Sequence, residues 1–162
     1  MVEIKTSEKE IEYKASVDER GNLVLKKKSE IKKGKKSRAS GASFELKVRR
    51  DLESKGWIID KWSNNVNLSD GKLESAKRKF NPFSKVMTIG TGFPDFICFQ
   101  KMGDYYKIIG VEVKKNGVLS KEEKEKCKWY LDKGIFSEIW IARDSGEIAY
   151  EDFKERYGKL WD

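Results

Sequence analysis

The sequence contains no histidine and has only two cysteines among its 162 residues. The absence of histidine excludes a histidine general base and every zinc site that needs a histidine ligand. Cys98 and Cys127 lie far apart in the chain, and no CxxC pair is present. Any acid–base or metal chemistry must therefore come from carboxylates, lysines and water.

Long apolar runs are also missing. No stretch approaches the roughly 18 apolar residues that a membrane-spanning helix needs, and the N-terminal segment MVEIKTSEKE has no signal-like apolar region. We therefore expect a soluble intracellular protein without membrane contact, located in the cytoplasm. The length predicts one core domain with appendages. The histidine-free composition, rich in lysine, glutamate and isoleucine, is compatible with a thermophilic source.

Positive charge is abundant and concentrated in one place. The chain has a formal net charge of +8, and the run KKKSEIKKGKKSR at 26–38 alone carries +7. This run has no apolar period, so it is either a solvated flexible linker or an arm that follows phosphates, and both can hold at once. The partial alternation on either side of Gly21-Asn22 predicts a β-hairpin before it. We therefore divide the chain into a hairpin extension (1–28), a basic linker (29–40) and a main domain (41–162).

A helix is predicted after the linker. Phe44, Val48 and Leu52 fall at i, i+4 and i+8 along one stripe, and Gly56 is a natural stop. Glu45 turns toward the same inward face. It is either a carboxylate of the first helical turn, favoured by the helix dipole, or a functional residue.

The segment 57–62 reads as a strand, and the long segment 63–92 that follows is harder to assign. Leu73, Ala76 and Phe80 lie at helical spacing, which predicts a short helix there. Its surface is either a solvated face or the wall of a groove for nucleic acid. The basic residues around it are Lys72, Lys77, Arg78 and Lys79.

Two apolar runs, FICFQ after Pro94-Asp95 and IIGVEVKK at 108–115, carry charges where a core would exclude them. If Gly103-Asp104 forms a two-residue hairpin turn, Asp95 lies directly opposite Glu112 in the antiparallel pair. Their Cβ atoms would then be about 5 Å apart. Two bare carboxylates cannot be so close unless a cation lies between them or one is protonated.

Lys114 projects from the same strand face as Glu112. A carboxylate pair with strand carbonyls makes an oxygen-only site suited to Mg²⁺, which keeps several waters or phosphate oxygens. A bound metal lowers the pKa of its water, and an adjacent ammonium positions that water or the phosphate. The alternative is a structural cluster of salt bridges at a sheet end.

The remaining pattern predicts a helix within 117–134, a strand at 137–144 and a short closing helix in 150–162. Ser120 and Glu123 fit a capping box, and Gly134 ends that first helix. The core order is thus helix, three strands, helix, strand.

This order resembles the PD-(D/E)XK nuclease superfamily, with Glu45 in the first helix, Pro94-Asp95 entering one strand and Glu112-Val113-Lys114 in the next. The segment 41–45 (GASFE) and the segment GVLSKEE at 117–123 are most similar to archaeal Holliday-junction resolvases and virus-type replication-repair nuclease domains. The resemblance covers roughly residues 41 to 143. One departure is that the glutamine of exonuclease-like branches is absent, with Lys126 preceding Tyr130.

The resemblance implies an α/β fold with a restriction-endonuclease-like core (αβββαβ, a central mixed sheet flanked by helices), here preceded by the β-hairpin extension. It implies that Asp95, Glu112 and the Val113 carbonyl bind Mg²⁺ or Mn²⁺, that Lys114 orients or activates the attacking water, and that Glu45 assists the metal. A viral or archaeal source and a homodimer would fit these relatives.

We therefore expect a metal-dependent DNA endonuclease, selective for branched DNA if it follows the resolvases. The alternative is a DNA-binding protein that keeps the fold without turnover, and RNA is a weaker third substrate. The residues expected to hold the DNA backbone are Lys32, Lys33, Lys35, Lys36, Arg38, Lys72, Lys77, Arg78, Lys79 and Lys115.

Overall fold

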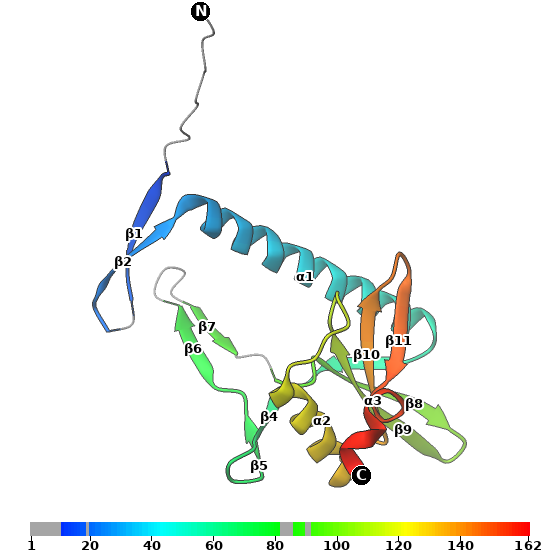
Figure 1. Ribbon diagram of the computed structural model, residues 1–162. Helices are drawn as coiled ribbons and strands as arrows, with labels where there is room; N and C mark the ends of the chain where they lie inside the picture. The colour runs from blue at the N-terminus through cyan, green and yellow to red at the C-terminus, as the bar shows by residue number, and fades with distance from the viewer. Residues whose placement is uncertain (1–10, 19, 82–85, 90–91) are drawn as a thin grey trace, which may run out of the picture. The chain divides into compact units, whose positions relative to one another are not determined.

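The computed structural model describes residues 11–18, 20–81, 86–89 and 92–162 (Figure 1). The chain forms two compact units, Met1–Ala42 and Ser43–Asp162, which are described separately.

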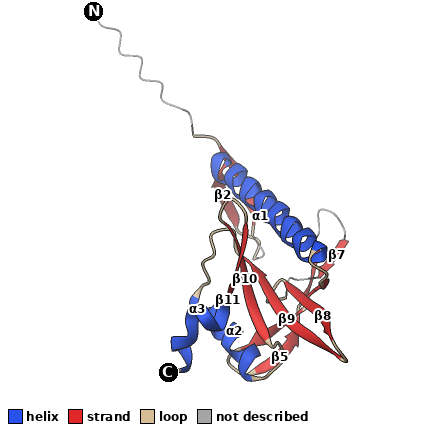
Figure 2. Cartoon of the chain, turned by 90° about the vertical axis from the view of Figure 1, so that its right-hand side faces the viewer, coloured by secondary structure: helices blue, strands red, loops and turns tan. Residues whose placement is uncertain are grey.

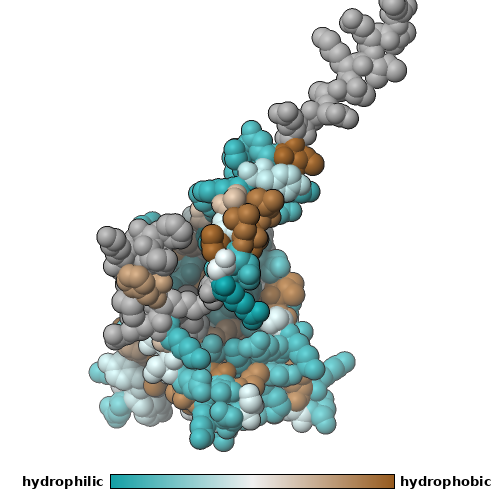
Figure 3. Space-filling view, turned by 90° about the vertical axis from the view of Figure 1, so that its left-hand side faces the viewer, coloured by the Kyte–Doolittle hydropathy of each residue, from teal (hydrophilic) through white to brown (hydrophobic). Residues whose placement is uncertain are grey.

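The first unit contains the predicted N-terminal hairpin. Strands β1 (Tyr13–Val17) and β2 (Leu23–Lys27) pair antiparallel. In the turn, the Asp18 carboxylate accepts hydrogen bonds from the backbone N–H groups of Arg20 and Asn22, and Gly21 supplies the positive φ of 84°. Apolar side chains of β1 and β2 are exposed, and hydrophobic residues, coloured brown, are visible among the hydrophilic surface in Figure 3.

Helix α1 (Lys28–Ser54) runs from the first unit into the second. Our prediction of a linker at 29–40 is wrong in this respect, because the structure is helical throughout that segment. Lysine and arginine are good helix formers and the segment contains no proline, so nothing in it stops a helix that is already stable beyond it. In the second unit the predicted stripe Phe44, Val48 and Leu52 is buried.

The second unit is built on a five-stranded mixed sheet in the order β11-β10-β9-β8-β3. The pair β9–β10 is parallel and the other neighbours are antiparallel. The predicted order of helix, three strands, helix and strand is found, with β11 added at one edge. The bounds are β3 Ile58–Lys61, β8 Phe96–Met102, β9 Tyr105–Val113, β10 Glu138–Asp144 and β11 Ile148–Asp152.

Helices cover both faces of this sheet (Figure 2). The C-terminal part of α1 packs on one face, against Phe96, Cys98, Ile109 and Val111. The other face carries α2 (Lys121–Asp132), α3 (Phe153–Tyr157) and the 3₁₀ turn η1 (Gly158–Trp161). Residues alternate between these faces along each strand, so Glu112 faces α2 while Val111 faces α1.

The segment 63–92 forms strands, so the helix that we predicted there is wrong. Strands β4 (Asn64–Asn67) and β5 (Lys72–Ser75) make one hairpin, and β6 (Arg78–Asn81) and β7 (Val86–Ile89) make another. Gly71, with φ of 60°, closes the first turn, and Val66 pairs with Leu73. Hairpin pairing thus overrides the helical spacing of Leu73, Ala76 and Phe80. The predicted closing helix is shorter than expected, because β11 extends to Asp152 before α3 begins.

Within the described part of the chain, none of the helices is both long enough and apolar enough to cross a membrane.

Candidate functional site

The β8–β9 hairpin brings Asp95 and Glu112 together. Its register runs from Met102 opposite Tyr105 to Phe96 opposite Val111, so the next pair is Asp95 and Glu112, as predicted. The backbone N–H of Asp95 donates to Glu112 Oε2 at 3.1 Å, and the backbone N–H of Val113 donates to Asp95 Oδ2 at 2.9 Å. Each carboxylate is therefore bound to the backbone of the opposite strand, which fixes both side chains at one end of the hairpin.

Two glycines allow the turn before Asp95 to take this position. A Cβ on Gly92 would lie 2.1 Å from the Trp62 carbonyl oxygen, and the Trp62 N–H donates to the Asp95 carbonyl at 3.2 Å. A Cβ on Gly110 would lie 2.8 Å from Pro94 Cγ. Both positions therefore need the absence of a side chain, because neighbouring atoms already fill the space that a Cβ would take.

Burial makes this carboxylate pair electrostatically costly. Glu112 is 4% exposed, and it is the one charged residue that is buried among the residues the structure describes. Burial raises its pKa, and the adjacent charge of Asp95 raises it further, to about 8 against an ordinary 4.5. Burial also raises the pKa of Asp95, although the hydrogen bond from Val113 and the ammonium groups of Lys61 and Lys114 oppose the rise. A positive charge between the two acids would relieve this cost.

Lys114 supplies one positive charge beside the pair. Its Nζ lies 3.0 Å from Glu112 Oε1 and 2.6 Å from Glu123 Oε1. Burial alone would lower the pKa of Lys114, but the hydrogen bonds and charges of Glu123 and Glu112 outweigh it, so the pKa is raised. Lys114 is therefore an ammonium at neutral pH, and it acts as a hydrogen-bond donor.

Glu123 belongs to this cluster, although sequence reasoning gave it only a role in capping α2. The capping box is present as predicted: Glu123 Oε2 accepts from the Ser120 N–H at 2.7 Å, and Ser120 Oγ accepts from the Glu123 N–H at 3.2 Å. The second carboxylate oxygen of Glu123 is the one that binds Lys114. The sequence signals the cap, but it does not signal that α2 begins beside Lys114.

Glu45 lies half-buried on α1 and forms an ion pair with Lys61 of β3. Lys61 pairs in register with Phe96, the residue after Asp95, and its ammonium lowers the pKa of Asp95. Glu45 is thus linked to Asp95 through Lys61, which pairs with Glu45 and whose charge acts on Asp95. Across the described ranges, no three side chains of the histidine, cysteine, aspartate or glutamate type form a group that could hold a metal ion, so Glu45 is not brought into one three-carboxylate cluster with the pair.

Lys61 is the second residue that sequence reasoning missed. Its signal was available, because placing the strand 57–62 antiparallel to the strand that follows Asp95 brings Lys61 to the same end of the sheet.

The predicted DNA-binding residues are on the surface wherever their side chains are described. Arg78 and Lys79 lie in β6, and only the backbone of these two residues is described. Lys115 lies 3.9 Å from the Asp144 carboxylate. The exposed residues are Lys32, Lys33, Lys35, Lys36 and Arg38 in the first unit and Lys72, Lys77 and Lys115 in the second.

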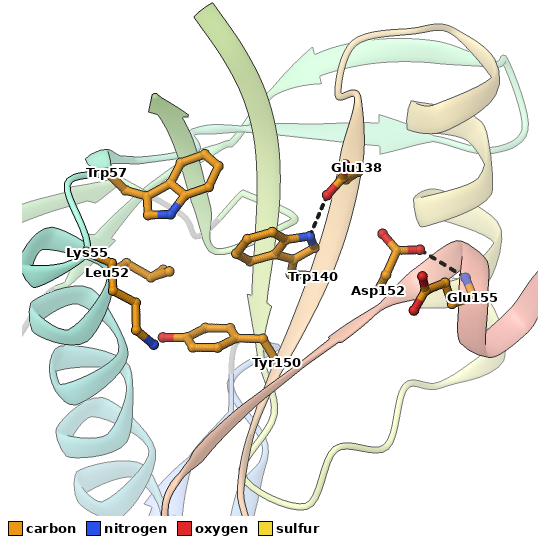
Figure 4. A pocket seen from close by; sticks show the side chains of 8 residues that line it. All are labelled: Leu52, Lys55, Trp57, Glu138, Trp140, Tyr150, Asp152 and Glu155. Atoms are coloured by element: carbon orange, nitrogen blue, oxygen red, sulfur yellow. Dashed lines mark hydrogen bonds between the residues drawn. The ribbon is translucent and has the colours of Figure 1, made fainter. Parts of the chain in front are cut away.

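A separate cleft of about 490 Å³ lies between the end of α1 and strands β10 and β11 (Figure 4). Two of its polar groups have partners within the chain: Trp140 Nε1 donates to Glu138 at 2.8 Å, and the Lys55 ammonium lies 2.7 Å from the Asp51 carboxylate. Figure 4 shows Trp57, Trp140 and Tyr150 on one side and Asp152 and Glu155 on the other. Its lining contains none of the predicted site residues.

Comparison of the chain with protein-family models, with curated proteins and with solved structures finds no match.

Proposed function

We propose that this chain is a Mg²⁺- or Mn²⁺-dependent DNA endonuclease that hydrolyses phosphodiester bonds at the Asp95–Glu112 pair. One observation carries the proposal: the Asp95 and Glu112 carboxylates lie next to each other at one end of the sheet, and the Lys114 ammonium lies 3.0 Å from Glu112. A structural ion pair needs one carboxylate for one ammonium. Burial raises the pKa of both acids on the hairpin, so a divalent cation bound between them would favour their ionised forms and offset the cost of ionising them.

The donors fit Mg²⁺ or Mn²⁺. These ions prefer oxygen ligands, and Mg²⁺ is commonly held by one or two carboxylates while keeping waters and substrate phosphate oxygens. Asp95 and Glu112 would hold the ion, and the resemblance to PD-(D/E)XK nucleases adds the Val113 carbonyl. When bound, such an ion supplies an activated water and offsets negative charge on the phosphate. The third acid of the family pattern, Glu45, would act through Lys61.

The chain's own residues supply positioning and charge. The hydrogen bonds from the backbone of Asp95 and Val113 fix the two carboxylates before any ligand arrives, so little reorganisation is needed. The Lys114 ammonium donates hydrogen bonds, so it would orient the attacking water or bind a non-bridging phosphate oxygen. Lys61 places a second ammonium near Asp95, where it would attract the DNA backbone.

A nucleic acid is the expected substrate because positive charge is concentrated in exposed residues, and the resemblance to PD-(D/E)XK nucleases favours DNA. Five lysines and arginines lie within 32–38 on α1, and all of their side chains are exposed. Such residues neutralise phosphates and release counterions, which makes binding fall steeply with salt. This observation also supports the second candidate, a DNA-binding protein without turnover. RNA stays a weaker third candidate substrate, because phosphate contacts alone do not distinguish it from DNA.

The test is a cleavage assay on linear, nicked, flap and four-way-junction DNA, with an RNA duplex in parallel. Wild type, Asp95→Asn and the control Asp70→Asn, which changes an exposed turn carboxylate, are compared in Mg²⁺, Mn²⁺ and EDTA. We expect cleavage by wild type and the control in either metal, and a loss of about 100-fold or more in Asp95→Asn. Equal rates in Asp95→Asn and wild type would refute the proposed site.

The second candidate gives a different result in the same assay. A binding protein without turnover would shift all DNA substrates in a salt-dependent manner and would leave them intact in both metals. Preference for one substrate in the panel would identify the DNA structure that the enzyme selects.

A further inference from the structure

We propose that Glu123 is a positioning residue for the reaction: it fixes the Lys114 ammonium beside Glu112, and it is itself fixed by the N-terminal cap of α2. This inference deepens the proposed function and rests on it for the role of Lys114 in catalysis. The link between Glu123 and Lys114 rests on geometry alone.

The two oxygens of the Glu123 carboxylate have separate tasks. Oε2 accepts from the Ser120 N–H at 2.7 Å, and Oε1 lies 2.6 Å from Lys114 Nζ. The Ser120 hydroxyl completes the cap by accepting from the Glu123 N–H. Glu123 therefore cannot rotate to follow Lys114 without breaking the capping box.

Helix α2 is a firm support for this carboxylate. Cys127 and Tyr130, one and two turns further along, are fully buried in the core on that face of the sheet. Tyr130 also accepts a hydrogen bond at 3.0 Å from Trp62 Nε1, and Trp62 binds the backbone of Asp95. The start of α2 and the turn before Asp95 are thus attached to the same packed cluster.

Lys114 needs such a support because a lysine side chain is long and has many rotamers. Its ammonium has two carboxylate partners: Glu112 on its own strand and Glu123 on α2. Glu112 is also a proposed metal ligand, so its oxygens would be shared once an ion is bound. Glu123 is then the partner that keeps the ammonium in place.

Glu123→Gln is the informative variant, because glutamine also serves in a capping box. A carboxamide has one acceptor oxygen, and its NH₂ group is a donor. If that oxygen accepts from Ser120, the NH₂ group faces the Lys114 ammonium, so the variant keeps the cap and loses the positioning contact. Ser120→Ala does the reverse, since it weakens the cap and keeps the carboxylate. Glu122→Gln, which changes an exposed neighbour paired with Lys126, is the matched control.

Steady-state cleavage in Mg²⁺ is measured for these variants with and without Lys114→Met. We expect Glu123→Gln to lower kcat by about 10- to 100-fold with KM within about threefold, as for a misplacement of about 1 Å. In the Lys114→Met background the same change should lower kcat less than about twofold, because its effect passes through Lys114. Equal losses in both backgrounds, or an equal loss from Glu122→Gln, would overturn the proposal.

Thermal unfolding of wild type, Glu123→Gln, Lys114→Met and the double variant, in EDTA and without DNA, provides a readout that does not require activity. We expect the melting temperature of the double variant Glu123→Gln/Lys114→Met to differ from the sum of the single shifts, since the two side chains are in contact. Additive shifts would overturn the positioning role whether or not the protein cleaves DNA. Absence of cleavage by wild type together with non-additive shifts would overturn the proposed function and leave the Glu123–Lys114 link supported.

Discussion

The cost of ionising Glu112 gives a quantitative prediction for the stability of the protein. Burial and the charge of Asp95 raise the pKa of Glu112 from 4.5 to about 8. Each pKa unit corresponds to about 1.4 kcal/mol, so full ionisation costs the folded state about 4 to 5 kcal/mol at most. Replacing Glu112 by glutamine keeps the shape of the side chain and removes this cost.

The sign follows from proton linkage. Between pH 4.5 and about 8, the folded state keeps the Glu112 proton and the unfolded state has lost it. The free energy of unfolding of wild type therefore falls as the pH rises through this window, by up to about 1.4 kcal/mol per pH unit. Asp95, whose pKa is also raised by burial, adds to the fall in the same direction.

The assay is urea unfolding in EDTA at intervals from pH 5 to pH 9, for wild type, Glu112→Gln and the surface control Glu125→Gln. We expect wild type and Glu112→Gln to have similar free energies of unfolding at pH 5, and Glu112→Gln to be more stable by several kcal/mol at pH 9. The control should follow wild type. Parallel curves for wild type and Glu112→Gln would refute the account of the pair as electrostatically costly.

Divalent metal extends the same experiment at pH 8. A ligand at 100 times its Kd stabilises the folded state by about 2.7 kcal/mol, so saturating Mg²⁺ should stabilise wild type by about this amount or more. It should leave Glu112→Gln nearly unchanged.

Three further changes test the surroundings of the site. Gly110→Ala should destabilise the protein by about 1 to 3 kcal/mol because its Cβ would clash with Pro94, whereas Gly158→Ala, with open space around it, should be near neutral in the same urea assay. Trp62→Phe removes the donor to the Tyr130 hydroxyl and should cost about 1 to 3 kcal/mol at neutral pH, measured by thermal unfolding. Replacing the exposed basic side chains of α1 by glutamine should reduce the salt dependence of DNA binding in fluorescence anisotropy, with an unchanged slope contradicting their role. The positions to change are Lys32, Lys33, Lys35, Lys36 and Arg38.

The central pair was predictable because it depends on local structure. A two-residue turn at Gly103-Asp104 fixes the register of the β8–β9 hairpin, so Asp95 and Glu112 follow from counting along the two strands. The capping box at Ser120 and Glu123 is equally local, and it is present as predicted. The nuclease resemblance itself stays a prediction.

Features that depend on distant contacts were harder to predict. The helix predicted near residues 72–80 failed because Leu73 finds its partner in Val66 across a turn that Gly71 closes. The basic linker proved helical because it continues a helix whose stability comes from Phe44 and residues beyond it. Lys61 and Glu123 reach the site from other elements, so their roles follow from tertiary packing rather than from any motif.

Calorimetric titration of Mn²⁺ into the protein without DNA tests the central claim most directly, with wild type, Asp95→Asn and the control Asp70→Asn. The account predicts one binding site in wild type and in the control, and at least a tenfold weaker affinity in Asp95→Asn. Binding of Mn²⁺ with equal affinity by all three proteins, or by none of them, would contradict it.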